Sequence, residues 1–81
     1  MEEQKDLYLI SLGERLRLLR SRRGLTRKGL AKLANVSERH LANVESGSSN
    51  ASVQFLRQLT GVLNCTLAEM IGEVAPENRS S

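Results

Sequence analysis

Apolar side chains recur every three or four residues along most of the chain, which is the period of an α-helix. A first stripe predicts a helix over residues 12–23, ended by Gly24. The stripe consists of Leu9, Leu12, Leu16 and Leu19. Asp6 offers an earlier cap that would add residues 7–12 to the helix, but Gly13 is expected to loosen that junction. The first helix therefore has two candidate starts.

Two short helices follow, joined by a turn with a specific chemistry. Thr26 and Ser37 are suited to cap helices over residues 27–34 and 38–46, because their hydroxyls accept hydrogen bonds from free main-chain amides. Asn35 tolerates the left-handed backbone that such a turn requires. The side chains expected to point inward are Leu30, Ala31, Leu33, Ala34, Val36, Leu41 and Val44. The pattern predicts a helix-turn-helix.

The last third of the chain predicts two more helices. Ser52 is suited to cap a fourth helix that Asn64 ends. Its stripe consists of Val53, Leu56, Leu59 and Leu63. Thr66 and Glu69 have the spacing of a capping box, in which each side chain binds the other residue's main-chain amide. The short fifth helix that they open would contain Leu67, Met70 and Ile71.

The composition favours one small all-α domain. The chain has 81 residues, 40% of them apolar, with one Pro and no alternating β-branched runs that would predict strands. We expect a five-helix domain over residues 12–72. Residues 1–11 would form an N-terminal arm or a helix extension, and residues 73–81 a flexible tail or the start of a linker.

Positive charge is concentrated in the middle of the chain. Residues 12–50 contain nine Lys or Arg against three Asp or Glu, whereas residues 1–11 and 51–81 are both net negative. A concentrated basic stretch is typical of a protein that binds a polyanion, although it can also be the solvated face of a helix.

Chemistry at a metal or a catalytic centre is not expected. One Cys and one His cannot build a structural zinc site, so no metal or cofactor is predicted. Gly24 and Gly29 have the spacing of a phosphate-binding loop, but Leu30 and Ala31 stand where that loop requires Lys and Ser or Thr. We assign no catalytic residue. The lack of a secretion signal or a long apolar run favours a cytoplasmic protein.

One long stretch of the chain resembles the Cro/C1-type helix-turn-helix regulators of bacteria and phages. It is LGERLRLLRSRRGLTRKGLAKLANVSERHLANVESG, continued by SVQFLRQLTGVLNCTLAEMI, about 60 of the 81 residues. The part LTRKGLAKLANVSERHLANVESG is most similar to BoxR-type regulators, which carry a shikimate-kinase-like domain and respond to benzoyl-CoA. The resemblance implies a lambda-repressor-like fold and a sequence-specific regulator, acting as a repressor on nucleoid DNA. A small-molecule effector is implied only if a further C-terminal domain exists.

Five positions depart from the family pattern. Asn35 replaces the usual turn Gly, Arg27 a common Gln, and Ala51 a frequent Pro. Gly29 and Gly61 lie inside helices, where each costs about 0.5–1 kcal/mol relative to Ala. We expect close packing or local adaptability at these two glycines.

The second helix of the helix-turn-helix would present five polar side chains to base edges in the major groove. They are Ser37, Glu38, Arg39, His40 and Asn43. Arg39 suits guanine and Asn43 suits adenine, because each side chain can form two hydrogen bonds with that base. Glu38 would accept from cytosine or hold Arg39 in position.

Contacts to the DNA backbone are expected on both sides of that helix. Arg27 and Lys28 open the helix over residues 27–34, whose amino end should face a phosphate, and the resemblance implies the same. Ser48, Ser49 and Asn50 would add amide and hydroxyl contacts. The other arginines of the first helix are read mainly as a solvated face: Arg15, Arg17, Arg22 and Arg23.

The resemblance also implies a structural ion pair between Arg20 and Glu45, because family members pair an Arg of the first helix with the Glu that ends the third. Such a pair would fasten the DNA-reading helix. Three roles stay open for His40: a DNA contact, a pH-sensitive switch or an exposed side chain. Cys65 is expected to be a small buried filler, with a thiol sensor as the alternative.

A single helix-turn-helix covers only a few base pairs, so a homodimer on double-stranded DNA is expected, with half-sites about 34 Å apart. The end of the fourth helix and the fifth helix would form the contact, through Leu67, Met70 and the surface near Val62. Two alternatives from other classes remain: an antitoxin-like module that neutralises another protein, and a helical protein-interaction domain.

Overall fold

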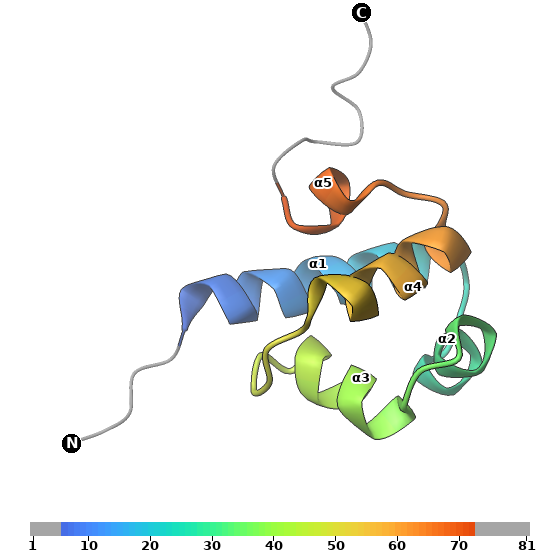
Figure 1. Cartoon of the computed structure of the whole chain (residues 1–81), viewed down its shortest axis with the longest axis horizontal. Helices are drawn as coiled ribbons and strands as arrows, with labels where there is room; N and C mark the ends of the chain where they lie inside the picture. The colour runs from blue at the N-terminus through green and yellow to red at the C-terminus, as the bar shows by residue number, and fades with distance from the viewer. Residues whose placement is uncertain (1–5, 73–81) are drawn as a thin grey trace, which may run out of the picture.

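The computed structural model describes residues 6–72, and within that range the chain is entirely helical (Figure 1). Its helices are α1 (Leu7–Arg22), α2 (Arg27–Ala34), α3 (Glu38–Glu45), α4 (Val53–Leu63) and α5 (Leu67–Met70). The all-α fold is confirmed. None of these helices is long and apolar enough to cross a membrane. The arm expected at residues 1–5 and the tail expected at residues 73–81 lie outside the described residues.

Side-chain caps open α2 and α3 where the sequence predicts them. Thr26 Oγ1 accepts from the amide of Gly29 at 2.9 Å, and Ser37 Oγ accepts from the amide of His40 at 3.1 Å. Asn35 lies between the two helices with a φ of 59°, which is the left-handed conformation. The turn of the helix-turn-helix therefore has the expected chemistry.

The earlier of the two candidate starts of α1 is the observed one. Asp6 Oδ1 accepts from the amides of Tyr8 at 2.9 Å and Leu9 at 3.4 Å, so the helix begins at Leu7 and continues through Gly13. The start at residue 12 was wrong. The cap supplied by Asp6 satisfies amides that an uncapped helix would leave without a partner.

Gly13 does not loosen α1; it brings α1 close to α3. A Cβ added at Gly13 would lie 2.6 Å from the carbonyl oxygen of Val44 and would also clash with the carbonyl of Glu45. Only a residue without a side chain permits this approach. The expectation of a weak junction at Gly13 was therefore wrong, because the glycine serves the packing of two helices.

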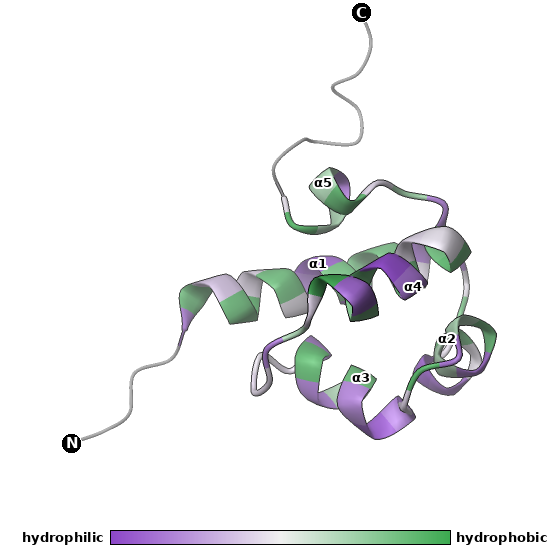
Figure 2. Ribbon diagram, viewed as in Figure 1, coloured by the Kyte–Doolittle hydropathy of each residue, from purple (hydrophilic) through white to green (hydrophobic). Residues whose placement is uncertain are grey.

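The core is aliphatic and lies between the helices. α1 packs on α3 and α5, α2 packs on α3 and α4, and α4 packs on α5. The largest fully buried side chains are Leu16, Leu30, Leu41, Val44, Leu59 and Met70. In Figure 2, hydrophobic and hydrophilic segments alternate along each helix, as expected for amphipathic helices around one core.

Two side chains assigned to the core are exposed. Leu33 is 63% exposed and Val53 is 60% exposed, so both inward assignments were wrong. On a helix with 3.6 residues per turn, each lies roughly 100° from the centre of its helix's buried face. The three- and four-residue spacing alone allowed either position.

Candidate nucleic-acid interface

The outer face of α3 is polar and open to solvent, while its inner face is fully buried. Glu38, Arg39 and Asn43 are exposed, and Leu41 and Val44 are 0% exposed. Figure 2 shows hydrophilic colour on α3 along the side turned away from α1 and α4. The structure therefore brings three of the five expected base-contacting residues to one free surface.

Ser37 and His40 have partners within the protein. Ser37 Oγ caps α3, and the imidazole of His40 packs edge-on against Phe55 of α4, with ring centroids 4.6 Å apart and an interplanar angle of 67°. His40 is half-buried for this reason. Sequence reasoning missed Phe55, which is the single Phe of the chain and a contact between α3 and α4. The pattern gave no signal for this pairing beyond the aromatic residue itself.

Glu38 does not hold Arg39 in the described part of the chain, where no ion pair joins them. Consecutive residues on a helix point in different directions, so an adjacent pair does not meet easily. The guanidinium of Arg39 is exposed and its donors face solvent. This leaves Arg39 available to a ligand outside the protein.

The loop between α3 and α4 is partly closed on itself. The main-chain amides of Ser48 and Ser49 both donate to the carbonyl oxygen of Asn43, at 3.0 and 3.2 Å. The Oδ1 of Asn50 accepts from the amide of Ala51 at 2.8 Å. The amide contacts that we expected from Ser48 and Ser49 are therefore already used. The Ser48 hydroxyl is used as well, because it donates to the carbonyl oxygen of Asn43 at 3.2 Å and lies 3.0 Å from the hydroxyl of Ser46. The hydroxyl of Ser49 and the side-chain amide nitrogen of Asn50 are the groups left without a partner among residues 6–72.

Arg20 and Glu45 lie in a two-point contact between α1 and α3. Arg20 Nε is 2.7 Å from Glu45 Oε2, and Arg20 Nη2 is 3.0 Å from Oε1, while Nη1 donates to the carbonyl of Leu25 at 2.9 Å. The Glu45 side chain is 2% exposed. Hydrogen bonding to Glu45 raises the pKa of Arg20, burial opposes that rise, and the charge of Glu45 adds to it.

Arg27 approaches the same carboxylate from a third helix. Its Nε is 3.5 Å from Oε1 of Glu45, and its side chain is 48% exposed. Lys28, beside it at the start of α2, is exposed. Sequence reasoning placed Arg27 on the DNA backbone and missed its contact with Glu45. The two residues are eighteen positions apart, so no local pattern could indicate the pair.

The remaining arginines of α1, and Arg23 directly after it, differ in their surroundings. Arg15 is half-buried, and a Cβ built at Gly72 would lie 3.2 Å from its Nε, so Arg15 packs where the chain leaves α5. The others are exposed, as a solvated helix face requires: Arg17, Arg22 and Arg23.

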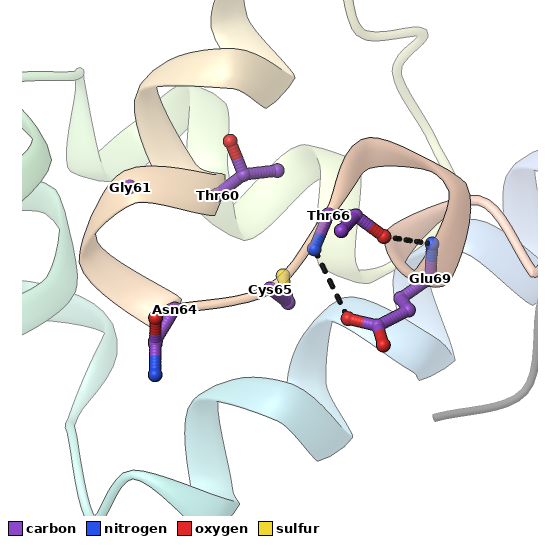
Figure 3. Close-up of a pocket in the computed structure, with 6 residues that line it drawn as sticks. All are labelled: Thr60, Gly61, Asn64, Cys65, Thr66 and Glu69. Carbon is purple, nitrogen blue, oxygen red and sulfur yellow. Dashed lines mark hydrogen bonds between the residues drawn. The ribbon is translucent and has the colours of Figure 1, made fainter. Parts of the chain in front are cut away.

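Cys65 lies in a shallow polar depression where α4 meets α5 (Figure 3). The depression is lined by Thr60, Gly61, Asn64, Cys65, Thr66 and Glu69. Thr66 and Glu69 form the predicted capping box, with both hydrogen bonds at 3.0 Å. Cys65 is half-buried, not fully buried; burial raises the pKa of its thiol, and the charge of Glu69 adds to the rise. Within residues 6–72, no group of three His, Cys, Asp or Glu could hold a metal ion.

The expected dimer contact needs a correction at Met70. That side chain is 0% exposed and belongs to the core of the monomer, so it cannot also contact a partner. Val62 and Leu67 are half-buried against the core, and Ile71, immediately after α5, is 46% exposed. The apolar groups available at this end of the molecule are therefore Ile71 and the outer parts of Val62 and Leu67.

Comparisons with known proteins agree with this geometry. Residues 11–70 match the model of the helix-turn-helix domain family. The immunity repressor protein of Bacillus phage phi105 is 33% identical over 64 residues, which is 79% of this chain and 44% of the repressor. The HTH-type transcriptional regulator DdrOP3 of Deinococcus deserti is 36% identical over 62 residues, 76% of this chain and 48% of that regulator. The chain thus spans about half the length of these relatives.

Two solved structures share the fold. The restriction-modification controller protein C.AhdI from Aeromonas hydrophila has a TM-score of 0.78 and 31% identity, covering 80% of this chain and 98% of that one. The clp gene regulator ClgR from C. glutamicum has a TM-score of 0.78 and 28% identity, covering 89% of this chain and 92% of that one. With its capped helix-turn-helix and exposed polar α3, the chain belongs to the helix-turn-helix domain family and, within it, to the Cro/C1 type.

Proposed function

We propose that this chain is a sequence-specific DNA-binding transcriptional regulator, a repressor, that inserts α3 into the major groove. The observation that carries the proposal is that α3 has a buried apolar face and an exposed polar face. Leu41 and Val44 anchor it in the core, whereas Glu38, Arg39 and Asn43 stand on its free face. A helix held in this way presents hydrogen-bonding groups to base edges without exposing an apolar surface.

Base recognition is assigned chiefly to Arg39 and Asn43. The guanidinium of Arg39 fits the O6 and N7 acceptors of guanine, and the carboxamide of Asn43 fits N6 and N7 of adenine. Glu38 is suited to accept from N4 of cytosine. Ser37 and His40 stand at the same end of α3 and contact the groove in this proposal with the atoms that their internal partners leave free.

Backbone recognition is assigned to the start of α2 and to the α3–α4 loop. Arg27 and Lys28 are exposed where α2 begins, and both the helix dipole and their charge favour a phosphate. The loop would contribute the hydroxyl of Ser49 and the side-chain amide nitrogen of Asn50, while the hydroxyl of Ser48 would have to give up its hydrogen bond to Asn43 before it could donate to a phosphate. These contacts orient α3 but carry no base sequence themselves.

The functional unit is a homodimer in this proposal, because one recognition helix covers too few base pairs for useful affinity. The surface at the end of α4 and at α5 is the proposed contact, with Ile71 at its centre and Val62 and Leu67 beside it. Ile71 is the most exposed apolar side chain of this region, at 46%. A two-fold dimer would place its recognition helices about 34 Å apart, on half-sites one helical turn apart.

A narrower relationship with BoxR-type regulators is also proposed, on the stretch LTRKGLAKLANVSERHLANVESG. It would place the protein on nucleoid DNA in a bacterial cytoplasm. It further implies that a small-molecule effector, a benzoyl thioester, acts through a domain beyond this one. A longer chain that contains this sequence followed by a kinase-like domain would support it.

Fluorescence anisotropy with a labelled duplex at two salt concentrations tests the function. The log of the binding constant should fall against the log of salt with a slope of about −0.9 per neutralised phosphate. Competition with unlabelled DNA of another sequence should reveal a preferred duplex. If binding to every duplex is absent, the antitoxin-like and protein-interaction alternatives take precedence.

A further inference from the structure

Three helices meet at one buried carboxylate. Glu45 of α3 is contacted by Arg20 of α1 through two hydrogen bonds and by Arg27 of α2 at 3.5 Å. Glu45 is buried, Arg20 is nearly so at 14% side-chain exposure, and Arg27 is half-exposed at 48%. The cluster therefore extends from the interior to the surface at the start of α2.

The two arginines stand in different relations to Glu45. Arg20 already donates to both carboxylate oxygens, which satisfies the buried charge. Arg27 shares one of those oxygens at a distance longer than a good hydrogen bond, and no hydrogen bond from its guanidinium occurs within residues 6–72. Two cations and one anion leave a net positive charge, and that charge lies on the exposed Arg27.

A half-exposed guanidinium that has no hydrogen bond to the described residues and carries excess positive charge is suited to an anion. Arginine offers five donors in a planar fork, so it can face a carboxylate on one edge and a phosphate on another. A neutral side chain at this position would not be drawn to Glu45 by charge. The chain thus carries a cation that faces both the fold and the solvent.

We propose that Arg27 is a positioning residue that bridges a DNA backbone phosphate to Glu45 at the end of the recognition helix. This inference rests on the proposed function. Through the bridge, a phosphate contact fixes where α3 sits in the groove, so Arg27 increases binding to the preferred duplex more than binding to any duplex. An ordinary phosphate contact would strengthen both kinds of binding equally.

Lys28 supplies a matched control. It is the next residue of α2, it is exposed, and it has no ion pair among the described residues. A loss of charge at Lys28 therefore reports a phosphate contact without the link to Glu45.

The test is an anisotropy titration of the wild type, Arg27→Gln, Arg27→Lys and Lys28→Gln. Each is measured on a duplex selected by the wild type from a random pool and on a scrambled duplex. Lys28→Gln should weaken binding to the selected duplex and to the scrambled duplex by the same factor. Arg27→Gln should weaken binding to the selected duplex at least about threefold more than binding to the scrambled duplex. Arg27→Lys should bind the scrambled duplex as tightly as the wild type does, but the selected duplex as weakly as Arg27→Gln does. An ammonium group can contact a phosphate, but it lacks the second edge of a guanidinium that would face Glu45.

Thermal melting separates bridging from folding. Arg27→Gln should melt within about 5 °C of the wild type, because Arg20 still donates to both oxygens of Glu45 and the Arg27 side chain is half-exposed. A larger drop would overturn the proposal in favour of a structural role. The proposal would also be overturned, in favour of an ordinary phosphate contact, if Arg27→Gln weakened binding to both duplexes equally and Arg27→Lys bound both as tightly as the wild type. A wild type that binds neither duplex overturns the proposed function itself.

Discussion

Gly13 of α1 lies against the main-chain carbonyl of Val44 in α3, at a separation that only glycine allows. A Cβ at position 13 would be 2.6 Å from the Val44 oxygen, well inside van der Waals contact. The crossing of α1 and α3 is therefore set by the absence of a side chain. Because α3 carries the proposed base contacts, this crossing also determines how the recognition helix is presented.

Gly13→Ala should destabilise the domain strongly. Overpacking of this kind costs about 1–3 kcal/mol, and the neighbouring atoms are main chain and cannot rotate away. The melting temperature should fall by about 4–8 °C for each kcal/mol lost. Thermal unfolding followed by circular dichroism measures the change.

Gly61→Ala is the matched control for that variant. A Cβ at Gly61, inside α4, would meet nothing within 4 Å, so the helical preference of Ala should stabilise the protein by about 0.5–1 kcal/mol. Of the two expectations for Gly61, close packing is therefore wrong, and local adaptability stays a prediction. Two Gly→Ala changes of opposite sign would support the geometry, and equal effects would contradict it.

Glu45→Gln should destabilise the fold because it leaves the Arg20 charge half-buried without its carboxylate. Removal of one partner of a buried pair costs roughly 3–5 kcal/mol. Glu38→Gln, on the exposed start of the same helix, should change the free energy of unfolding by less than about 0.5 kcal/mol. Urea unfolding of both variants gives the comparison. Unchanged melting temperature and DNA affinity in Glu45→Gln would refute the fastening role.

The Cys65 thiol should react slowly with a neutral alkylating reagent in the folded protein. Its pKa is raised first by burial and then by Glu69, so less thiolate is present at pH 8 than in the unfolded chain. The raised pKa also makes stability depend on pH. The contribution of Cys65 to the free energy of unfolding is complete below the pKa that the thiol has in the unfolded chain, and it is lost as pH rises through the higher pKa of the folded protein. Faster alkylation in buffer than in denaturant would contradict the account and favour a thiol sensor.

Ile71→Asp should weaken the dimer without unfolding the monomer. Ile71 is 46% exposed at the proposed contact, so a carboxylate there stays solvated in the monomer but is buried in the dimer. Leu33→Asp, at a side chain 63% exposed on α2, is the control and should leave the association unchanged. Analytical ultracentrifugation of both variants measures their association into dimers. A wild type that is monomeric both free and on a palindromic duplex would remove the dimer proposal.

Local features of the fold were predictable because their causes lie within a few residues. The caps at Thr26, Ser37 and Ser52, the left-handed Asn35 and the helix end at Asn64 depend on adjacent main-chain groups, and all occur where the sequence indicates. The choice between two starts of α1 was not predictable, because Gly13 is unfavourable within an isolated helix and its compensation comes from α3.

The candidate site was predictable in its residue types but not in its connections. The exposed face of α3 follows from the 3.6-residue period around Leu41 and Val44. The contacts of Phe55 with His40 and of Arg27 with Glu45 join separate helices, so no periodic signal indicates them. Long-range contacts of this kind decide which polar side chains remain free.

The central claim is that α3 recognises bases, and binding by Arg39→Ala tests it most directly. The wild type and the variant are titrated by anisotropy on the duplex selected by the wild type and on a set in which each base pair is changed in turn. The account predicts that Arg39→Ala loses about 1–3 kcal/mol on the selected duplex and no longer discriminates at one G·C pair, while its melting temperature is unchanged. Wild-type discrimination at every base pair in the variant would contradict the account.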